Sequence, residues 1–158
     1  MANTQAMCTS FLGELMTATH NFGTAPVRAA TTADTFKAAL YLTTATVNAS
    51  TTAYSATNEV SGTGYTAGGV AVTNATAPTA TNSSSTAGTA YWTPSASITY
   101  TTVTLTTAFD TVLIYNSTQS NKAVSVHTFG SQTITAGTFT LTMPSNTTST
   151  ALLRLATT

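Results

Sequence analysis

The sequence predicts a mainly β protein, an antiparallel β-sandwich or jelly-roll-like barrel, with one N-terminal α-helix. Threonine makes up about a quarter of the 158 residues, and this β-branched residue favours strands. From residue 97 onward, short segments of alternating apolar and polar residues are separated by turn residues, a pattern typical of sandwiches and barrels. The length fits one domain with its own core. We expect a helix and arm over residues 1–30 and a β-domain over residues 31–158.

The predicted helix covers residues 7–22. Its apolar side chains recur near the helical period and would form one stripe, made of Phe11, Leu12, Leu15, Met16 and Phe22. Gly23 suits the position after the last turn, and Pro26 prevents the helix from continuing. The stripe has two possible partners, either the chain's own sheet or the surface of another protein.

Residues 34–46 predict the first strand. Every second residue from Phe36 to Leu42 is apolar on one side, and Tyr41 faces the other side. A short helix over residues 37–42 is the alternative, because alanine and leucine also favour helices.

Residues 58–74 contain glycines at positions 62, 64, 68 and 69 and predict a constrained turn that leads into a strand. Tyr65, between the two glycine pairs, is a candidate packing anchor. Glycine-rich loops can also bind phosphate, but they need a following lysine or helix. No lysine follows before Lys122, and the next residues have strand character, so a structural turn is expected.

Residues 74–90 are a low-complexity run of small polar residues and alanine, which predicts a flexible, exposed loop. Tyr91 and Trp92 follow it directly. An aromatic pair beside such a loop suits contact with carbohydrate or protein, and packing in the core is the alternative.

The rest of the chain predicts antiparallel strands. Residues 97–107 change the parity of their apolar positions midway, which indicates a β-bulge. Residues 110–116 and 123–129 have the spacing of a hairpin. Turns are expected at Gly130 and at residues 136–137, with further strands at residues 132–135, 139–143 and 151–156.

Charged side chains are scarce, since they form only 5% of the residues and their formal net charge is zero. Nucleic acid is therefore an unsuitable partner, because binding to phosphates needs clustered Lys and Arg. The sequence contains no run of about twenty apolar residues, so it predicts no membrane-spanning helix. A neutral surface favours association, so we expect a subunit of a larger assembly.

Groups able to perform catalysis are also few. The acidic residues and histidines are Glu14, Asp34, Glu59, Asp110, His20 and His127. No motif selects a serine as a nucleophile, and the two histidines lack metal-ligand spacing. The single cysteine, Cys8, is interpreted as a small apolar residue. We expect no enzyme activity, no cofactor and no metal, and we expect His127 to face solvent or a subunit contact.

Several blocks occur in a distinctive order. The chain opens with Met-Ala-Asn-Thr-Gln and continues with Asp34-Thr-Phe-Lys-Ala-Ala-Leu-Tyr, then Glu59-Val-Ser-Gly-Thr-Gly-Tyr-Thr-Ala-Gly-Gly. Asp110 precedes Leu-Ile-Tyr-Asn, and Ser149-Thr-Ala-Leu-Leu-Arg closes the chain. Over nearly its whole length the chain resembles small virion structural proteins of tailed bacteriophages.

This resemblance implies a capsid decoration, or cement, protein on the exterior of the virion head, with the major capsid protein as its partner. Decoration at local three-fold positions would require a homotrimer. Candidate contact residues are Phe11, Leu12, Leu15, Met16, Tyr65, Tyr91 and Trp92. The alternative is a tail or fibre protein that contacts the host surface through its aromatic pair and the adjacent loop.

Overall fold

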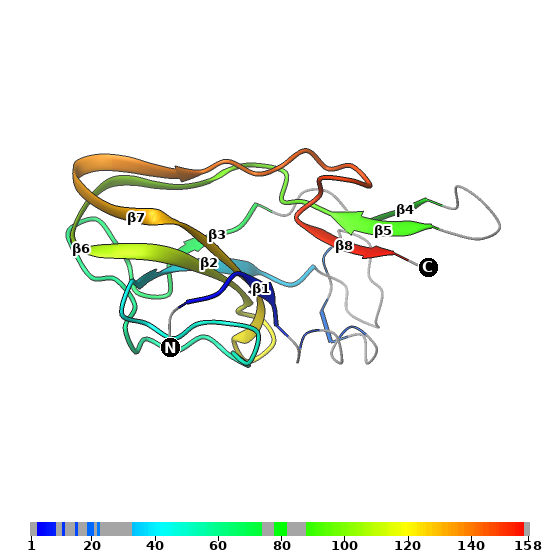
Figure 1. Cartoon of the computed structure of the whole chain (residues 1–158), viewed down its shortest axis with the longest axis horizontal. Helices are drawn as coiled ribbons and strands as arrows, with labels where there is room; N and C mark the ends of the chain where they lie inside the picture. The colour runs from blue at the N-terminus through cyan, green and yellow to red at the C-terminus, as the bar shows by residue number, and fades with distance from the viewer. Residues whose placement is uncertain are drawn as a thin grey trace.

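A computed structural model describes residues 3–8, 11, 15, 19–20, 22, 33–73, 78–81 and 88–156. The described part is mainly β, as predicted, and its strands form two antiparallel sheets (Figure 1). The larger sheet has the order β1-β7-β6-β2-β3, and the smaller one has the order β4-β5-β8. The strands are β1 (Ala6–Met7), β2 (Phe36–Leu42), β3 (Val70–Ala71), β4 (Thr79–Thr81), β5 (Thr89–Trp92), β6 (Ile98–Asn116), β7 (Lys122–Leu141) and β8 (Leu153–Ala156).

No complete helix over residues 7–22 is seen in the described part of the chain, which includes only residues 7–8, 11, 15, 19–20 and 22 of that range and in which Phe11 and Leu15 are helical. Ala6 and Met7 instead form β1, which pairs with Val126 and Ser125 at the edge of β7. This pairing satisfies backbone N–H and C=O groups at the edge of β7. The spacing of apolar side chains carries no information about such backbone pairing, so it did not predict this strand. Among the stripe residues, Leu12 and Met16 lie outside the described residues.

Strand β2 confirms the strand interpretation of residues 34–46 and excludes a helix over residues 37–42. It pairs with β6 along its whole length, from Phe36 opposite Asn116 to Leu42 opposite Phe109. Both of its faces are covered, since the residues from Ala38 to Tyr41 are all buried. β2 is therefore an interior strand, and its burial outweighs the helix propensity of its alanines and leucine.

The second half of the chain differs from the predicted series of short strands. β6 and β7 are 19 and 20 residues long, and they pair as one hairpin from Ile98 opposite Leu141 to Asn116 opposite Lys122. The turns expected at Gly130 and at residues 136–137 are irregularities inside β7. Shifts in pairing register, including one between Tyr100 and Val103, absorb them, so the expected β-bulge in residues 97–107 is confirmed.

This long hairpin folds back on itself (Figure 1). The rings of Phe129 and Phe139, both in β7, have centroids only 5.0 Å apart, whereas ten residues of straight strand span about 33 Å. Positive φ angles at Thr102 and Ala136 occur in the same region of the two strands. Phe139 also packs on Tyr100 and Phe109 of β6, with ring centroids 6.0 and 5.3 Å apart, and both of these residues are buried.

The smaller sheet extends away from the larger one (Figure 1). Its central strand, β5, pairs with β4 through Thr79–Tyr91 and with β8 through Trp92–Leu153. β4 and the beginning of β5 lie within residues 74–90, which were predicted as a flexible loop, so that prediction is wrong for residues 79–81 and 89–90. Residues 74–77 and 82–87 lie outside the described residues. Alternating threonine and alanine can pair as strands when a neighbouring strand is available.

Candidate functional site

The glycine-rich segment surrounds a carboxylate of the chain itself. Glu59 is 9% exposed, and its Oε1 accepts hydrogen bonds from the backbone N–H of Gly68 at 2.8 Å and from the hydroxyl of Tyr65 at 2.7 Å. The hydroxyl of Tyr54 donates to Oε2, also at 2.7 Å. The backbone donor that a phosphate loop would offer to a ligand is therefore bound to Glu59, and this segment is a structural turn.

The tyrosines around Glu59 connect the turn to the sheet. The hydroxyl of Tyr65 also accepts a hydrogen bond from the N–H of Leu40 at 3.0 Å, and the hydroxyl of Tyr115 donates to the carbonyl of Gly68 at 2.8 Å. Burial, together with the hydrogen bond to Glu59, raises the pKa of Tyr65 well above its ordinary value. Tyr65 thus remains a neutral donor and acts as the packing anchor that its position predicted.

A second buried polar cluster joins the end of β6 to the N-terminal region. The side-chain Oδ1 of Asn116 accepts hydrogen bonds from the backbone N–H groups of Thr118 and Gln119, both at 3.1 Å. Its Nδ2 then faces Oδ2 of Asp34 at 2.8 Å and Nδ1 of His20 at 3.0 Å. Because an amide nitrogen only donates, Nδ1 of His20 must be unprotonated, so this cluster holds a neutral histidine.

His127 lies half-buried in a surface groove, and the expectation that it faces solvent or a subunit contact stays a prediction. Its Nε2 is 2.9 Å from Oγ of Ser125, two residues earlier in β7. Burial lowers the pKa of His127 to about 4, so the imidazole is neutral at pH 7. Within the described residues no carboxylate is hydrogen-bonded to His127. Among these residues the pair has no third group of the kind that orients a catalytic histidine.

The groove that contains His127 lies between the edges of the two sheets and has a volume of about 510 Å³. Gln5 and Ala6 line it from the β1 side, and Arg154 and Ala156 line it from β8. Its lining mixes polar and apolar groups. The guanidinium of Arg154 donates to the carbonyl of Ser149 at 2.6 Å.

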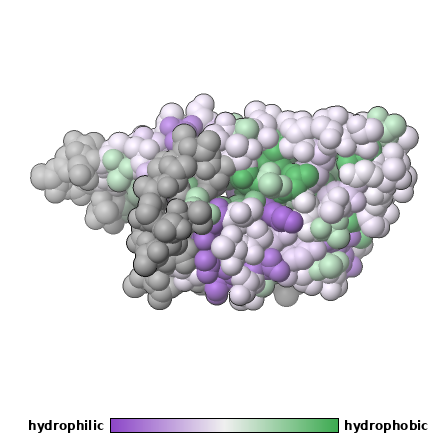
Figure 2. Space-filling view, turned by 180° about the vertical axis from the view of Figure 1, so that it is seen from behind, coloured by the Kyte–Doolittle hydropathy of each residue, from purple (hydrophilic) through white to green (hydrophobic). Residues whose placement is uncertain are grey.

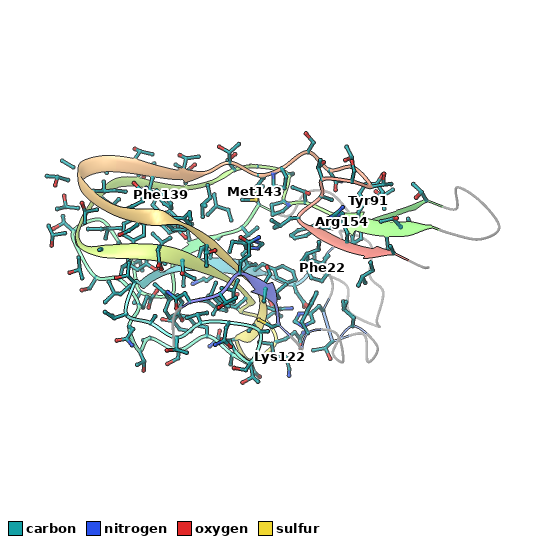
Figure 3. All side chains as sticks on the ribbon, viewed as in Figure 1. Phe22, Tyr91, Lys122, Phe139, Met143 and Arg154 are labelled. Carbon is teal, nitrogen blue, oxygen red and sulfur yellow. The ribbon has the colours of Figure 1, made fainter. Side chains whose placement is uncertain are left out.

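A separate apolar pocket of about 90 Å³ lies against the small sheet. Phe11, Leu15 and Phe22 line it from the N-terminal region, and side chains of β5 and β8 complete it. Phe22 packs on Phe36 and on Trp92, with ring centroids 4.6 and 4.9 Å apart. Figure 3 shows Phe22 beneath the small sheet, with Tyr91 and Arg154 on adjacent strands.

Four of the seven candidate contact residues line this pocket, namely Phe11, Leu15, Tyr91 and Trp92. Phe11 and Trp92 are only 1% and 2% exposed, so they form its inner wall and belong to the core of this chain. Tyr65 lies elsewhere, beside Glu59. Leu12 and Met16 lie outside the described residues.

Leu155 also lines the pocket and is 47% exposed. Sequence reasoning missed it as a contact residue, although the alternation of Leu153, Arg154 and Leu155 could have indicated it. The pattern places Leu155 on the same face as buried Leu153, but only the structure shows that β8 runs past the edge of the core.

The rest of the visible surface is weakly polar. Figure 2 shows a face that is mostly pale, with a few strongly hydrophilic groups and a hydrophobic area in a hollow. The described residues contain no group of three or more His, Cys, Asp or Glu side chains able to hold a metal ion. They also include no helix with the length and hydrophobicity of a membrane span. Comparison of the chain with models of protein families, with curated proteins and with solved structures finds no match.

Proposed function

We propose that this protein is a bacteriophage capsid decoration protein that binds the outside of the virion head and stabilises contacts between capsomers. The observation that carries the proposal is the apolar pocket beside exposed Leu155 on a chain with only eight charged side chains, four basic and four acidic. Such a surface can recognise a partner by shape and apolar contact, because it has little charge with which to select one. The resemblance to virion structural proteins supports the same function.

In this proposal the partner is the major capsid protein. A single apolar side chain of the capsid surface would enter the pocket next to Tyr91, and the neutral, threonine-rich surface around it would cover the contact. A protein that binds only the assembled lattice stabilises it by mass action, by about 2.7 kcal/mol per site when its free concentration is about 100 times Kd.

The layered packing of the sheets suits this role. The larger sheet is buried on both faces in its centre, along residues 38–41, 111–116 and 123–126, and the folded-back hairpin forms a second layer, so we interpret the architecture as a variant of the β-sandwich. Such a body presents a fixed surface, and little conformational entropy is lost when it binds. Binding at local three-fold positions would require three copies.

The location of the protein can be tested by cryo-electron microscopy of intact particles of the phage that encodes the chain. Regular density of this size over the outside of the head supports the proposal. Density confined to the tail would refute it and favour the alternative, a tail or fibre protein that contacts the host surface.

The stabilising role has a separate test. Heads that carry the protein should release their DNA at a higher temperature than heads that lack it. The variant Ala90→Glu places a charge at an exposed residue of the pocket lining, and it should lose this effect. Thr133→Glu, at an exposed position of β7 far along the hairpin, adds the same charge and should keep the effect.

A further inference from the structure

The groove that contains His127 has walls from three parts of the fold. Ser125 and His127 line it from β7, Thr89 and Arg154 line it from the small sheet, and Thr148 lines it from the segment that leads into β8. Its volume of about 510 Å³ lies in the range of sites that hold small molecules. The groove is therefore large enough for a ligand.

Arg154 brings a positive charge to this groove. Its Nη1 donates to the carbonyl of Ser149 at 2.6 Å, which orients the guanidinium and leaves its other N–H donors for a ligand. No acidic residue is among the described residues that line the groove, and Arg154 forms no ion pair within the described part of the chain. The planar fork of a guanidinium matches a carboxylate, so the charge of the groove suits an organic anion.

The other polar groups of the groove are neutral and can form hydrogen bonds. Nε2 of His127 lies 2.9 Å from Oγ of Ser125, and Nδ1 of the same ring has no hydrogen-bond partner among the described residues. Burial lowers the pKa of His127 to about 4, so the imidazole adds no second charge at pH 7. The exposed side chains of Gln5 and Thr148 add an amide and a hydroxyl. Neutral donors and acceptors around one cation match a ligand with several hydroxyl groups and one negative charge.

We propose that the groove binds a sugar that carries a carboxylate, with the carboxylate on Arg154 and the sugar hydroxyls on His127, Gln5 and the neighbouring hydroxyl groups. An apolar acid would match the guanidinium, but it would displace water from the neutral polar groups without replacing the hydrogen bonds of that water. A neutral sugar would match those groups and gain nothing from the charge. The apolar part of the lining, which includes Val126 and Leu152, suits the C–H face of a sugar ring.

This site differs from the contact proposed for the capsid. Leu153 and Arg154 are the only described residues that line both the groove and the apolar pocket. Sugar binding is measured on the purified protein, so its outcome does not depend on which part of a virion the protein occupies.

The two histidines of the chain provide a probe and an internal control, because each gives its own ring C–H signals in proton NMR. His127 lines the groove, whereas His20 lies in the cluster with Asn116, and the variant His127→Gln identifies which signals belong to which ring. Titration with glucuronate at constant pH 7 should shift the His127 signals saturably, with a Kd in the millimolar range. The His20 signals should stay in place. A His127 signal without a saturable shift, or equal shifts of both histidines, would overturn the inference.

Two further compounds separate the parts of the ligand. Glucose has the ring hydroxyls without the charge, and hexanoate has the charge without the hydroxyls. Each should bind about tenfold more weakly than glucuronate, or weaker still. Glucose binding as tightly as glucuronate would exclude the carboxylate contact, and hexanoate binding as tightly would exclude recognition of a sugar. Either result would overturn the proposed ligand class.

Variants of Arg154 test the carboxylate contact. Arg154→Gln should weaken glucuronate binding about tenfold or more, and Arg154→Lys, which keeps the charge and loses the planar fork, should fall between the two. Lys122→Gln removes the same charge at the start of β7, outside the groove, and should bind glucuronate as the unmodified chain does. The melting temperature of Arg154→Gln should stay close to that of the unmodified chain, since Arg154 is exposed. Equal affinity of Arg154→Gln and the unmodified chain would overturn the proposal.

Discussion

The backbone N–H of Gly68 lies 2.8 Å from Oε1 of Glu59, so the glycine-rich turn closes around a carboxylate from its own chain. The two residues are nine positions apart, and Tyr54 and Tyr65 complete the set of donors. A buried carboxylate that accepts three hydrogen bonds joins the two segments that carry Tyr54 and Tyr65, and each of these tyrosines also stacks on a tyrosine of β6.

Replacing Glu59 with alanine should destabilise the protein by about 3 kcal/mol, because one buried donor, the N–H of Gly68, and two part-buried tyrosine hydroxyls lose their acceptor at once. Glu59→Gln keeps the shape and one acceptor oxygen, and it should cost about half as much. The measurement is the free energy of unfolding in urea. Equal stability of the alanine variant and the unmodified chain would show that the cluster does not hold the turn.

Gly69 gives a second test of the same turn. Its φ is +71°, and a Cβ there would lie within 1.7 Å of the carbonyl oxygen of Ala38. Gly69→Ala should therefore cost about 3 kcal/mol or more, since the left-handed conformation and the backbone clash both oppose it. Gly130→Ala is the matched control, because nothing lies within 4 Å of its added Cβ, and its stability should change by less than about 1 kcal/mol.

Asn116→Asp should destabilise the fold at neutral pH. The new carboxylate would lie beside Oδ2 of Asp34, which is 2.8 Å from the present amide nitrogen, and two adjacent carboxylates repel when both are ionised. We expect a loss of about 3 kcal/mol at pH 7, partly recovered near pH 5 as the pair takes up a proton. Asn121→Asp in the same turn is exposed and should change stability little at either pH.

His127 should make stability fall in mild acid. Its pKa is lowered from 6.5 to about 4 by burial, so the unfolded chain binds a proton at a higher pH than the folded chain does. The contribution is fully present above about pH 6.5 and is lost as the pH falls toward 4. The expected loss is about 2 kcal/mol.

Other groups also titrate in this range, so the test is a difference between two proteins. The free energy of unfolding of the unmodified chain and of His127→Gln is measured in urea at pH 7 and pH 4.5. The unmodified chain should lose more stability than the variant by about 2 kcal/mol. Equal losses would show that His127 is protonated as easily in the folded chain as in the unfolded one.

Local patterns in the sequence predicted part of this fold. Alternation around Phe36 identified β2, the two apolar runs ending near Asn116 and beginning near Ala123 identified the hairpin, and the glycines identified the turn at Gly69. Each of these signals comes from residues close together in the chain, where side-chain period and backbone freedom act directly.

The clusters around Glu59 and Asn116 could not be predicted in this way. Their members come from separate elements, as with Asp34 and Asn116, which are 82 residues apart. The sequence around a polar residue does not show which distant group will form a hydrogen bond with it. Only the folded chain decides whether it is buried and paired or exposed to solvent.

By itself the sequence determined the β class of the protein, its weakly charged surface and its glycine turn, because composition and short-range period act within each segment. Tertiary structure decided that Ala6 and Met7 join a sheet edge, that the long hairpin brings Phe129 against Phe139, and that Leu155 is left exposed. These outcomes depend on pairing and packing between distant segments, where the burial of shared apolar area and the satisfaction of backbone groups outweigh local propensity.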